Sequence, residues 1–274
     1  MKGAPAGDRG DSAQERRNRA YTRMYWEKEV PVLKTFGLRD GMSVVELGSG
    51  GGTLTDFLLR RFPGIAVTSV ELRAEAVALA RTYLRDRGHT DVRIVQADVL
   101  KTGLPEDSFD FAYARLVFRY LSDPLGAIRE TLRILKPEGK LVISDIDLGL
   151  WGFFDPPVPE LKPALDAYGR MLAARGGDAY IGRRVIGLLE AVGLAHTKVE
   201  AVATTSDDLG EGMSMETFLA PVGWGRLARM VKRGWLTRHA MKEARETWDH
   251  FLTSPSAFVL KVLWMSGGEK AAHP

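Results

Sequence analysis

The sequence predicts an α/β protein with a doubly wound, mostly parallel sheet of seven strands and a helical cap. Three observations support this fold class. Short apolar runs alternate with helical segments along most of the 274 residues, a pattern typical of parallel strands joined by right-handed crossovers. The first apolar run ends in Glu46 and then breaks into glycines at alternate positions before a helical segment. Two long segments, 147–182 and 206–255, follow strands at the edge where open sheets bind ligands.

Each expected element rests on a local pattern. The leading helix is interrupted by Pro31 and stops at Gly37, and the helix before the sixth strand stops at Gly193. Apolar periodicity predicts helices at 21–36, 53–62, 73–87, 124–135 and 183–191. Short apolar or β-branched runs predict strands at 43–47, 67–71, 92–96, 109–114, 140–145, 197–204 and 257–265.

The glycine run after the first strand can bring bare backbone against a ligand, because glycine adopts positive φ and has no Cβ. Its spacing is G-x-G-x-G, and Thr53 stands where a dinucleotide fingerprint would place its third glycine. Glu71 ends the second strand, where a carboxylate can accept hydrogen bonds from both hydroxyls of a ribose. Asp98 ends the third strand, where it suits an amine donor such as adenine N6.

Several motifs occur in a fixed order: Glu46–Gly52, Glu71, Ala97-Asp98, Leu104–Asp110 and Leu132–Ile143. Together they resemble the class I S-adenosylmethionine-dependent methyltransferases, most closely the small-molecule group related to the ubiquinone/menaquinone-biosynthesis methyltransferases. The resemblance covers residues 40–147 closely and is weaker from 183 onward. It implies a Rossmann-like methyltransferase fold with a reversed seventh strand, S-adenosyl-L-methionine as cofactor and S-adenosyl-L-homocysteine as product. One departure is Lys136–Gly139, where the family more often has Pro-Gly-Gly.

The resemblance also implies a role for each matching residue. The glycine loop would line the methionine and ribose portion of the cofactor, with Glu46 beneath it. Glu71 would take the ribose hydroxyls, Leu72 would pack on the adenine, and Asp98 would address its edge. Two tyrosines of the leading helix could fold over the cofactor as a lid or pack against the sheet edge. The expected cofactor-binding residues are Tyr21, Tyr25, Glu46, Gly48, Ser49, Gly50, Gly52, Glu71, Leu72, Asp98, Val99, Ala114 and Arg115.

Methyl transfer needs a base only when the acceptor must lose a proton, because positioning supplies much of the acceleration. His250, in the second cap segment, is one candidate, although a structural histidine is the alternative. Asp145 and Asp147 end the fifth strand and are candidate bases or substrate ligands, or merely caps of the loop. Arg115 could pair with an anionic group of the substrate or support the loop.

The two cap segments, 147–182 and 206–255, are rich in aromatic and Met residues, which favours a cavity for an apolar or aromatic small molecule. About half of these residues are expected to be ordinary core. They are Trp151, Phe153, Phe154, Tyr168, Met171, Tyr180, Met213, Met215, Phe218, Trp224, Met230, Trp235, Met241, Trp248 and Phe251.

Composition narrows the class of protein. No cysteine is present, which excludes disulfides and Cys-based zinc sites, and no metal site is predicted. No apolar run approaches the ~20 residues that span a bilayer, and the start lacks an apolar signal core, so a cytoplasmic enzyme is expected. Residues 1–20 are predicted to form a disordered tail and 21–274 a single domain, with a homodimer as one oligomeric option.

A basic stretch lies within 224–245, although the net charge is only +3 and argues against nucleic acid as the partner. It could attract an anionic substrate, an acidic carrier protein or a membrane surface, or simply be a solvated helix face. Its cations are Arg226, Arg229, Lys232, Arg233, Arg238, Lys242 and Arg245, facing only Glu243.

Three functional hypotheses follow. The first is a methyltransferase acting on oxygen, nitrogen or carbon of an apolar small metabolite, such as a natural-product or quinone precursor. The second is a protein or RNA methyltransferase, and the third is a non-methylating binder or cyclase that retains the cofactor. Asp155–Val158 resembles the D-P-P-Y signature of adenine amino-methyltransferases, but it follows the fifth strand instead of the fourth and ends in Val158. Base methylation is therefore disfavoured.

Overall fold

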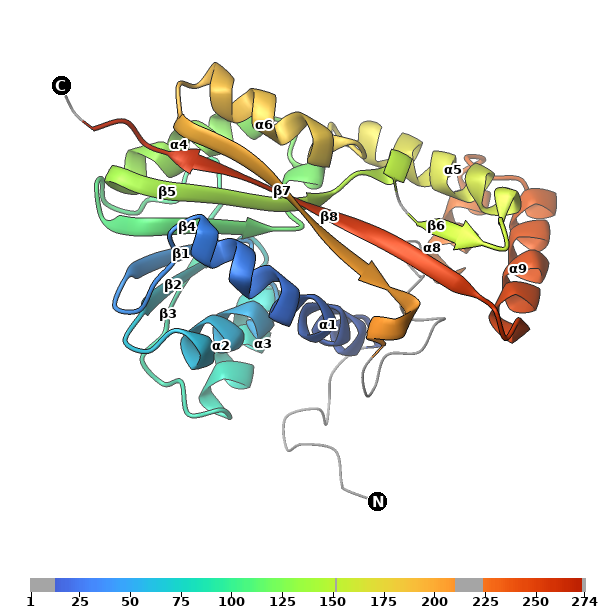
Figure 1. Ribbon diagram of the computed structural model, residues 1–274, viewed down its shortest axis with the longest axis horizontal. Helices are drawn as coiled ribbons and strands as arrows, with labels where there is room; N and C mark the ends of the chain where they lie inside the picture. Colours follow the sequence, from blue (N-terminus) through green and yellow to red (C-terminus); the bar gives the residue numbers. More distant parts are fainter. Residues whose placement is uncertain (1–12, 151, 210–223, 273–274) are drawn as a thin grey trace.

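The computed structural model describes residues 13–150, 152–209 and 224–272. Its centre is a sheet of eight strands in the order β3-β2-β1-β4-β5-β8-β6, with β7 also paired to β8 (Figure 1). The strands are β1 Ser43–Leu47, β2 Ala66–Glu71, β3 Arg93–Gln96, β4 Phe109–Arg115, β5 Leu135–Ile146, β6 Phe153–Asp155, β7 Ala195–Thr205 and β8 Phe258–Glu269. Strands β1 to β5 are parallel, and β8 runs antiparallel to β5, β6 and β7, so the doubly wound fold with a reversed strand is confirmed.

The described helices cover both faces of the sheet, with α1, α2 and α3 on one face and α4 and α6 on the other (Figure 1). Neighbouring strand residues alternate between two cores, as Val44 and Val45 do in β1. A further group, α5, α8 and α9, gathers at one end of the sheet as the cap (Figure 1). The helices are α1 Ala13–Thr35, α2 Thr53–Arg61, α3 Ala74–Arg85, α4 Pro124–Ile134, α5 Lys162–Ala173, α6 Ile181–Ala191, α8 Trp224–Lys232 and α9 Arg238–Thr253.

Two expectations need correction. Helix α1 begins at Ala13, so residues 13–20, placed in a disordered tail, are helical. The Arg19 guanidinium lies 4.0 Å from the centre of the Tyr83 ring, and this contact with α3 holds the start of α1 against the body. The first cap segment also contains an unpredicted strand, β6, whose Phe153 and Asp155 pair with the start of β8.

The cap has its own cores. Tyr168 and Met171 of α5 are buried with Leu227 and Met230 of α8. A second cluster stacks Trp248 on Phe251, with ring centres 5.3 Å apart. The first cluster holds the cap helices together, whereas the second, which includes Val259 of β8, joins the cap to the sheet, so part of the cap aromatics are ordinary core. Met213, Met215, Phe218 and Trp151 lie outside the described residues.

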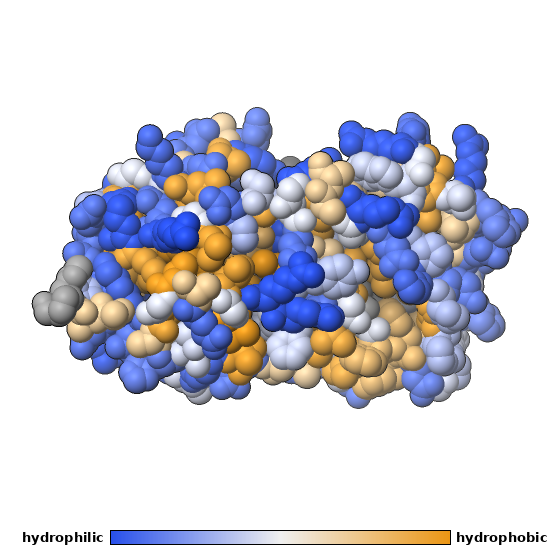
Figure 2. Space-filling model, turned by 90° about the horizontal axis from the view of Figure 1, so that it is seen from above, coloured by the Kyte–Doolittle hydropathy of each residue, from blue (hydrophilic) through white to orange (hydrophobic). Residues whose placement is uncertain are grey.

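The basic stretch is a largely solvated face. Leu227, Met230 and Leu236 point inward, while Arg229, Lys232, Arg233 and Arg238 are exposed. Lys242 and Arg245 pair one turn along α9 with Glu246 and Asp249. Seen from above, hydrophilic side chains are prominent at the cap end of the molecule and are interspersed with apolar ones (Figure 2). Within the described part of the chain, no helix is long and apolar enough to cross a membrane.

Candidate cofactor and catalytic site

The glycine loop between β1 and α2 lies across the carboxyl end of β2. The amides of Gly48 and Ser49 both donate to the carbonyl of Val70, at 2.8 and 3.1 Å. Gly48 has φ +75° and packs so closely that a Cβ there would lie 2.4 Å from a methyl of Val117. Gly50 has φ +54°, and no described atom lies within 4 Å of where its Cβ would be. The loop therefore packs tightly at Gly48 and leaves open space over Gly50.

Glu71 points at this loop from the end of β2. Its Oε2 accepts a hydrogen bond from the Gly50 amide at 2.9 Å, and its Oε1 accepts one from the Arg73 amide at 3.0 Å. The next residue, Leu72, is 60% exposed although its side chain is large and apolar. The Glu71 carboxylate, held at the glycine loop, is thus followed directly by the exposed apolar side chain of Leu72. This arrangement suits a nucleoside, because the carboxylate can accept hydrogen bonds from a sugar and the apolar side chain can pack on a base.

Asp98 and Val99 follow β3. Val99 is buried, whereas Asp98 is exposed and its Oδ1 accepts a hydrogen bond from the Leu100 amide at 2.9 Å. This bond caps the turn between Asp98 and Lys101. The adenine-edge roles of Asp98 and Val99 stay predictions.

Glu46 lies in β1, two residues before the glycine loop, and is almost completely buried. Its Oε2 accepts hydrogen bonds from Thr55 Oγ1 at 2.5 Å and Ser69 Oγ at 3.2 Å. Burial raises its pKa to about 7, although both hydroxyls lower it and the negative charge of Glu71 raises it further. Glu46 therefore titrates near neutral pH and is held beneath the loop by two hydroxyls that the sequence reading did not assign.

Arg115, at the end of β4 beside Ala114, is part of a buried ion pair with Glu29 of α1. The Arg115 Nε donates to both Glu29 oxygens, at 2.9 and 3.0 Å, and the Tyr113 hydroxyl donates to Glu29 Oε2 at 2.8 Å. Arg115 is therefore charge-compensated from α1, and a role in holding an anionic substrate group would have to share it with Glu29. A signal for Glu29 exists in the sequence, because an acid there interrupts the apolar stripe of Trp26, Val30 and Leu33.

The two lid tyrosines lie on the same helix. Tyr21 and Tyr25 stack with ring centres 6.5 Å apart, and the Arg115 guanidinium lies 5.8 Å from the Tyr25 ring. Burial raises the pKa of Tyr25 well above its ordinary value, and Tyr25 packs in the core between α1 and the sheet. Packing against the sheet, the alternative weighed for this residue, describes Tyr25 better than a mobile lid. The cofactor contact of Tyr21 stays a prediction.

The acids that end β5 are engaged in ion pairs, and their roles as candidate bases or substrate ligands stay predictions. The Arg119 Nη1 donates to Asp145 Oδ1 at 3.0 Å, and the Arg119 amide donates to Asp145 Oδ2 at 3.1 Å. Burial raises the pKa of Asp145 while Arg119 lowers it. Asp147 pairs with Arg183 and accepts from the Gly149 amide at 2.8 Å. Arg119 is 26 residues from Asp145 in the chain and Arg183 is 36 residues from Asp147, so no local sequence pattern predicts either pair.

His250 lies in the last turn of α9 with an exposed side chain, while its neighbours Trp248 and Phe251 are buried. This exposure is what the alternative of a structural surface histidine leads one to expect, and the role of His250 as a base stays a prediction.

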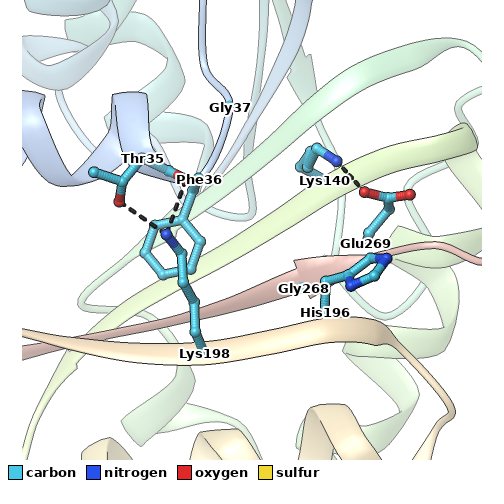
Figure 3. Close-up of a pocket in the computed structure, with 8 residues that line it drawn as sticks. All are labelled: Thr35, Phe36, Gly37, Lys140, His196, Lys198, Gly268 and Glu269. Carbon is cyan, nitrogen blue, oxygen red and sulfur yellow. Dashed lines mark hydrogen bonds and ion pairs between the residues drawn. The ribbon is translucent and has the colours of Figure 1, made fainter.

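A separate hollow of about 300 Å³ lies between the end of α1, Lys140 of β5, the start of β7 and the end of β8, and no residue of the glycine loop lines it (Figure 3). Its two lysines are already engaged. Lys140 pairs with Glu269, and Lys198 Nζ donates to the Thr35 carbonyl at 2.9 Å (Figure 3). This hollow therefore offers little unused charge to a ligand.

Comparisons with known proteins agree with the motifs. Residues 45–143 match the family model described as a methyltransferase domain. The chain is 30% identical over 149 residues to the ubiquinone/menaquinone biosynthesis C-methyltransferase UbiE of Pectobacterium atrosepticum, covering 54% of this chain and 57% of that protein. It is 31% identical over 103 residues to the malonyl-[acyl-carrier protein] O-methyltransferase of Paenibacillus sp., covering 37% of each. The chain thus spans between about a third and just over half of the length of these curated relatives.

Solved structures share the fold. The phosphoethanolamine N-methyltransferase 2 of Haemonchus contortus, in complex with S-adenosyl-L-methionine, is 16% identical with a TM-score of 0.58, covering 98% of this chain and 61% of that one. The [4+2]-cyclase SpnF is 20% identical with a TM-score of 0.54, covering 86% and 78%. At such identities the likeness supports the fold alone.

Proposed function

We propose that this chain, whose residues 45–143 form a class I S-adenosylmethionine-dependent methyltransferase domain, transfers a methyl group to a small apolar or aromatic molecule held under its cap. The observation that carries the proposal is the Glu71 carboxylate, anchored 2.9 Å from the Gly50 amide beside open space. The acceptor atom is an oxygen, nitrogen or carbon. The curated relatives are an O-methyltransferase and a C-methyltransferase, which favours oxygen or carbon as the acceptor atom.

The residues around the loop fit the cofactor. Two buried polar atoms there, Ser49 Oγ and Arg115 Nη2, lack a hydrogen-bond partner among the described residues. A hydroxyl and a guanidinium suit the amino-acid end of S-adenosylmethionine, because buried donors without partners are costly unless a ligand satisfies them. Glu71 would hold the ribose, and Leu72 would cover one face of the adenine. When bound, the cofactor supplies a methyl group that is already activated towards nucleophiles.

The protein's own contribution is then to position the acceptor atom against the methyl group and to exclude water from the site. The tight packing of Gly48 against Val117 sets how closely β4 and the loop approach. The buried Arg115–Glu29 pair fixes α1 against the end of β4. Both contacts make the walls of the proposed site rigid, and a rigid site can hold nucleophile, methyl group and sulfur in line, which supplies much of the acceleration in methyl transfer.

Calorimetry with S-adenosylmethionine tests the proposal. Wild-type protein should bind, and Gly50→Val should not, because the side chain enters the open space and the residue has φ +54°. Gly88→Val is the matched control, since Gly88 also has positive φ, +84°, and open space around it but lies at the end of α3. Equal binding by both variants would reject the site.

The alternatives have their own outcomes. Binding of S-adenosylmethionine with no methylated product from a broad panel of metabolites would favour the non-methylating binder or cyclase. Retention of RNA that weakens steeply with salt would favour a nucleic-acid substrate. We expect neither, because the cap cores are apolar and the cations of α8 and α9 are spread over a solvated face.

A further inference from the structure

Three cations form a stripe along the exposed face of α8, at the cap end of the molecule (Figure 1). Arg229, Lys232 and Arg233, which we call the α8 stripe, are spaced three and four residues apart, so their side chains leave the helix on the same side. The Arg233 amide donates to the Arg229 carbonyl at 3.2 Å and so continues the helical turn. Leu227 and Met230 are buried in a core with α5, so the stripe is held towards water.

The charges of the α8 stripe are not compensated. All three side chains are exposed, and none forms an ion pair with a carboxylate of the described residues. The adjacent helix α9 differs, because Lys242 and Arg245 pair one turn further along with Glu246 and Asp249. Like charges three and four residues apart repel each other and destabilise a helix. The stripe is therefore a cost to α8 on its own, and a negatively charged partner would remove that cost.

More positive charge lies at the same end of the cap. Arg238 begins α9 and is exposed, and Arg170 of α5 donates to the Trp235 carbonyl at 2.6 Å, which places it at the turn between α8 and α9. Residues 224–253 hold seven cations and three acids, a net charge of +4 with neutral histidines, whereas the whole chain carries +3. The rest of the chain is thus slightly acidic, and the positive charge is concentrated on the cap.

Apolar side chains accompany these cations. Val231 and Trp235 are both partly exposed, and the Arg233 guanidinium lies 5.5 Å from the centre of the Trp235 ring. Anionic lipids attract clustered lysines and arginines, and the head-group region of a bilayer also accepts an aromatic ring with an apolar body and a polar edge. A soluble polyanion such as RNA would neutralise the cations but would give Val231 no apolar contact. The mixture of side chains therefore favours a bilayer surface.

We propose that the α8 stripe docks this protein on a membrane surface that contains anionic lipids, with Arg170 and Arg238 extending the contact. The docking is peripheral, because no helix of the described residues is long and apolar enough to cross a bilayer. It would bring the cap to a surface where apolar molecules concentrate. That benefit rests on the proposed function, whereas the docking itself does not.

Co-sedimentation with lipid vesicles tests the proposal. Vesicles of phosphatidylglycerol and phosphatidylcholine should retain the wild-type protein and release it as salt is added, because salt screens exposed charges. Vesicles of phosphatidylcholine alone should retain little of it. The triple variant Arg229→Gln, Lys232→Gln, Arg233→Gln should bind the anionic vesicles about 100-fold more weakly, from a loss of roughly fivefold for each cation.

A matched variant removes three cations from other parts of the molecule. Arg61 of α2, Arg93 of β3 and Arg129 of α4 are also exposed and form no ion pair with a described carboxylate. Replacing all three by Gln lowers the net charge by the same amount as in the first variant. Vesicle binding should nevertheless stay close to that of wild type. Circular dichroism checks that both variants are folded.

Equal losses in the two triple variants, or no retention of wild type by anionic vesicles, would overturn the proposal. Binding of wild type to RNA or polyglutamate without retention on vesicles would also overturn it and assign the stripe to a soluble polyanion. Gly50→Val keeps the result separate from the proposed function, because this variant should lose S-adenosylmethionine and still bind vesicles. A wild-type protein that binds vesicles but not the cofactor would reject the proposed function alone.

Discussion

Removing Glu29 should destabilise the protein strongly, because it would leave a buried guanidinium without its counter-ion. The Glu29 side chain is completely buried and accepts hydrogen bonds from Arg115 Nε at 2.9 Å and from the Tyr113 hydroxyl at 2.8 Å. Breaking a buried ion pair on one side costs about 3–5 kcal/mol, since the remaining charge stays in a medium that solvates it poorly. Glu29→Ala should therefore lose a large share of a stability that is only about 5–15 kcal/mol for typical domains.

Urea unfolding followed by circular dichroism measures this loss. The midpoint should fall while the slope stays constant, since a change of slope would report a change in the unfolded chain instead. Lys28→Ala is the control one residue earlier in α1. It removes the half-exposed pair between Lys28 and Asp208 and should cost no more than about 1 kcal/mol.

A double variant, Glu29→Ala with Arg115→Met, separates the charge from the packing. Removing both members of the pair should restore part of the stability, because no buried charge is then left alone. If Glu29→Ala lay within about 1 kcal/mol of wild type, the description of Arg115 as a compensated buried charge would be refuted.

Three further predictions concern single side chains. Glu46 has a folded pKa of about 7 against 4.5 when unfolded, so the folded state holds its proton more tightly; this contribution to stability is present at low pH and lost as pH rises through 7. The free energy of unfolding should decline between pH 5 and 8 in wild type, by at most about 3 kcal/mol, and should decline less in Glu46→Gln. Equal declines in the two proteins would contradict the burial of an ionisable carboxyl. Leu72→Ser should weaken S-adenosylmethionine binding by about fivefold, from roughly 1 kcal/mol of lost apolar contact, with no change in stability. Leu79→Ser, on the exposed face of α3, should leave calorimetric affinity unchanged, and equal losses in both variants would argue against an adenine contact. Asp147→Asn should lower the free energy of unfolding by about 1–3 kcal/mol, because it weakens the pair with Arg183, and should retain affinity for the cofactor. Lost affinity with normal stability would instead indicate that Asp147 contributes to cofactor binding.

The parts of the site that follow from the sequence are those set by strand ends. Glu46, the glycine loop and Glu71 lie at the carboxyl ends of neighbouring parallel strands, and such ends meet at one edge whatever the surrounding chain does. The order of motifs was therefore enough to place Glu71 over Gly50. Even Glu138, which stands where the family more often has glycine, adopts φ +63° and keeps the turn before the paired part of β5.

The contacts that could not be predicted from the sequence are those between residues that only packing brings together. Arg119 reaches Asp145 and Glu29 reaches Arg115 only after helices and turns far apart in the chain have docked. Strand β6 is three residues long and is followed by two prolines, so its existence depends on the length of β8 and not on its own pattern. The start of α1 reads as a polar tail because its anchor is a tyrosine of another helix, stacked under Arg19.

Strand β8 has a consequence for biosynthesis. It inserts between β5 and β7 and also pairs with β6, so β6 and β7 depend on residues 258–269 for their strand hydrogen bonds and β5 depends on them along one edge. While the ribosome is still making those residues, β5 has an open edge and β7 has no neighbour among the described strands. Open edges invite intermolecular pairing, so the nascent chain passes through an aggregation-prone interval that ends only when β8 inserts. Ribosome stalling before Phe258 should therefore yield chains that associate with chaperones, whereas stalling well beyond Glu269 should release them.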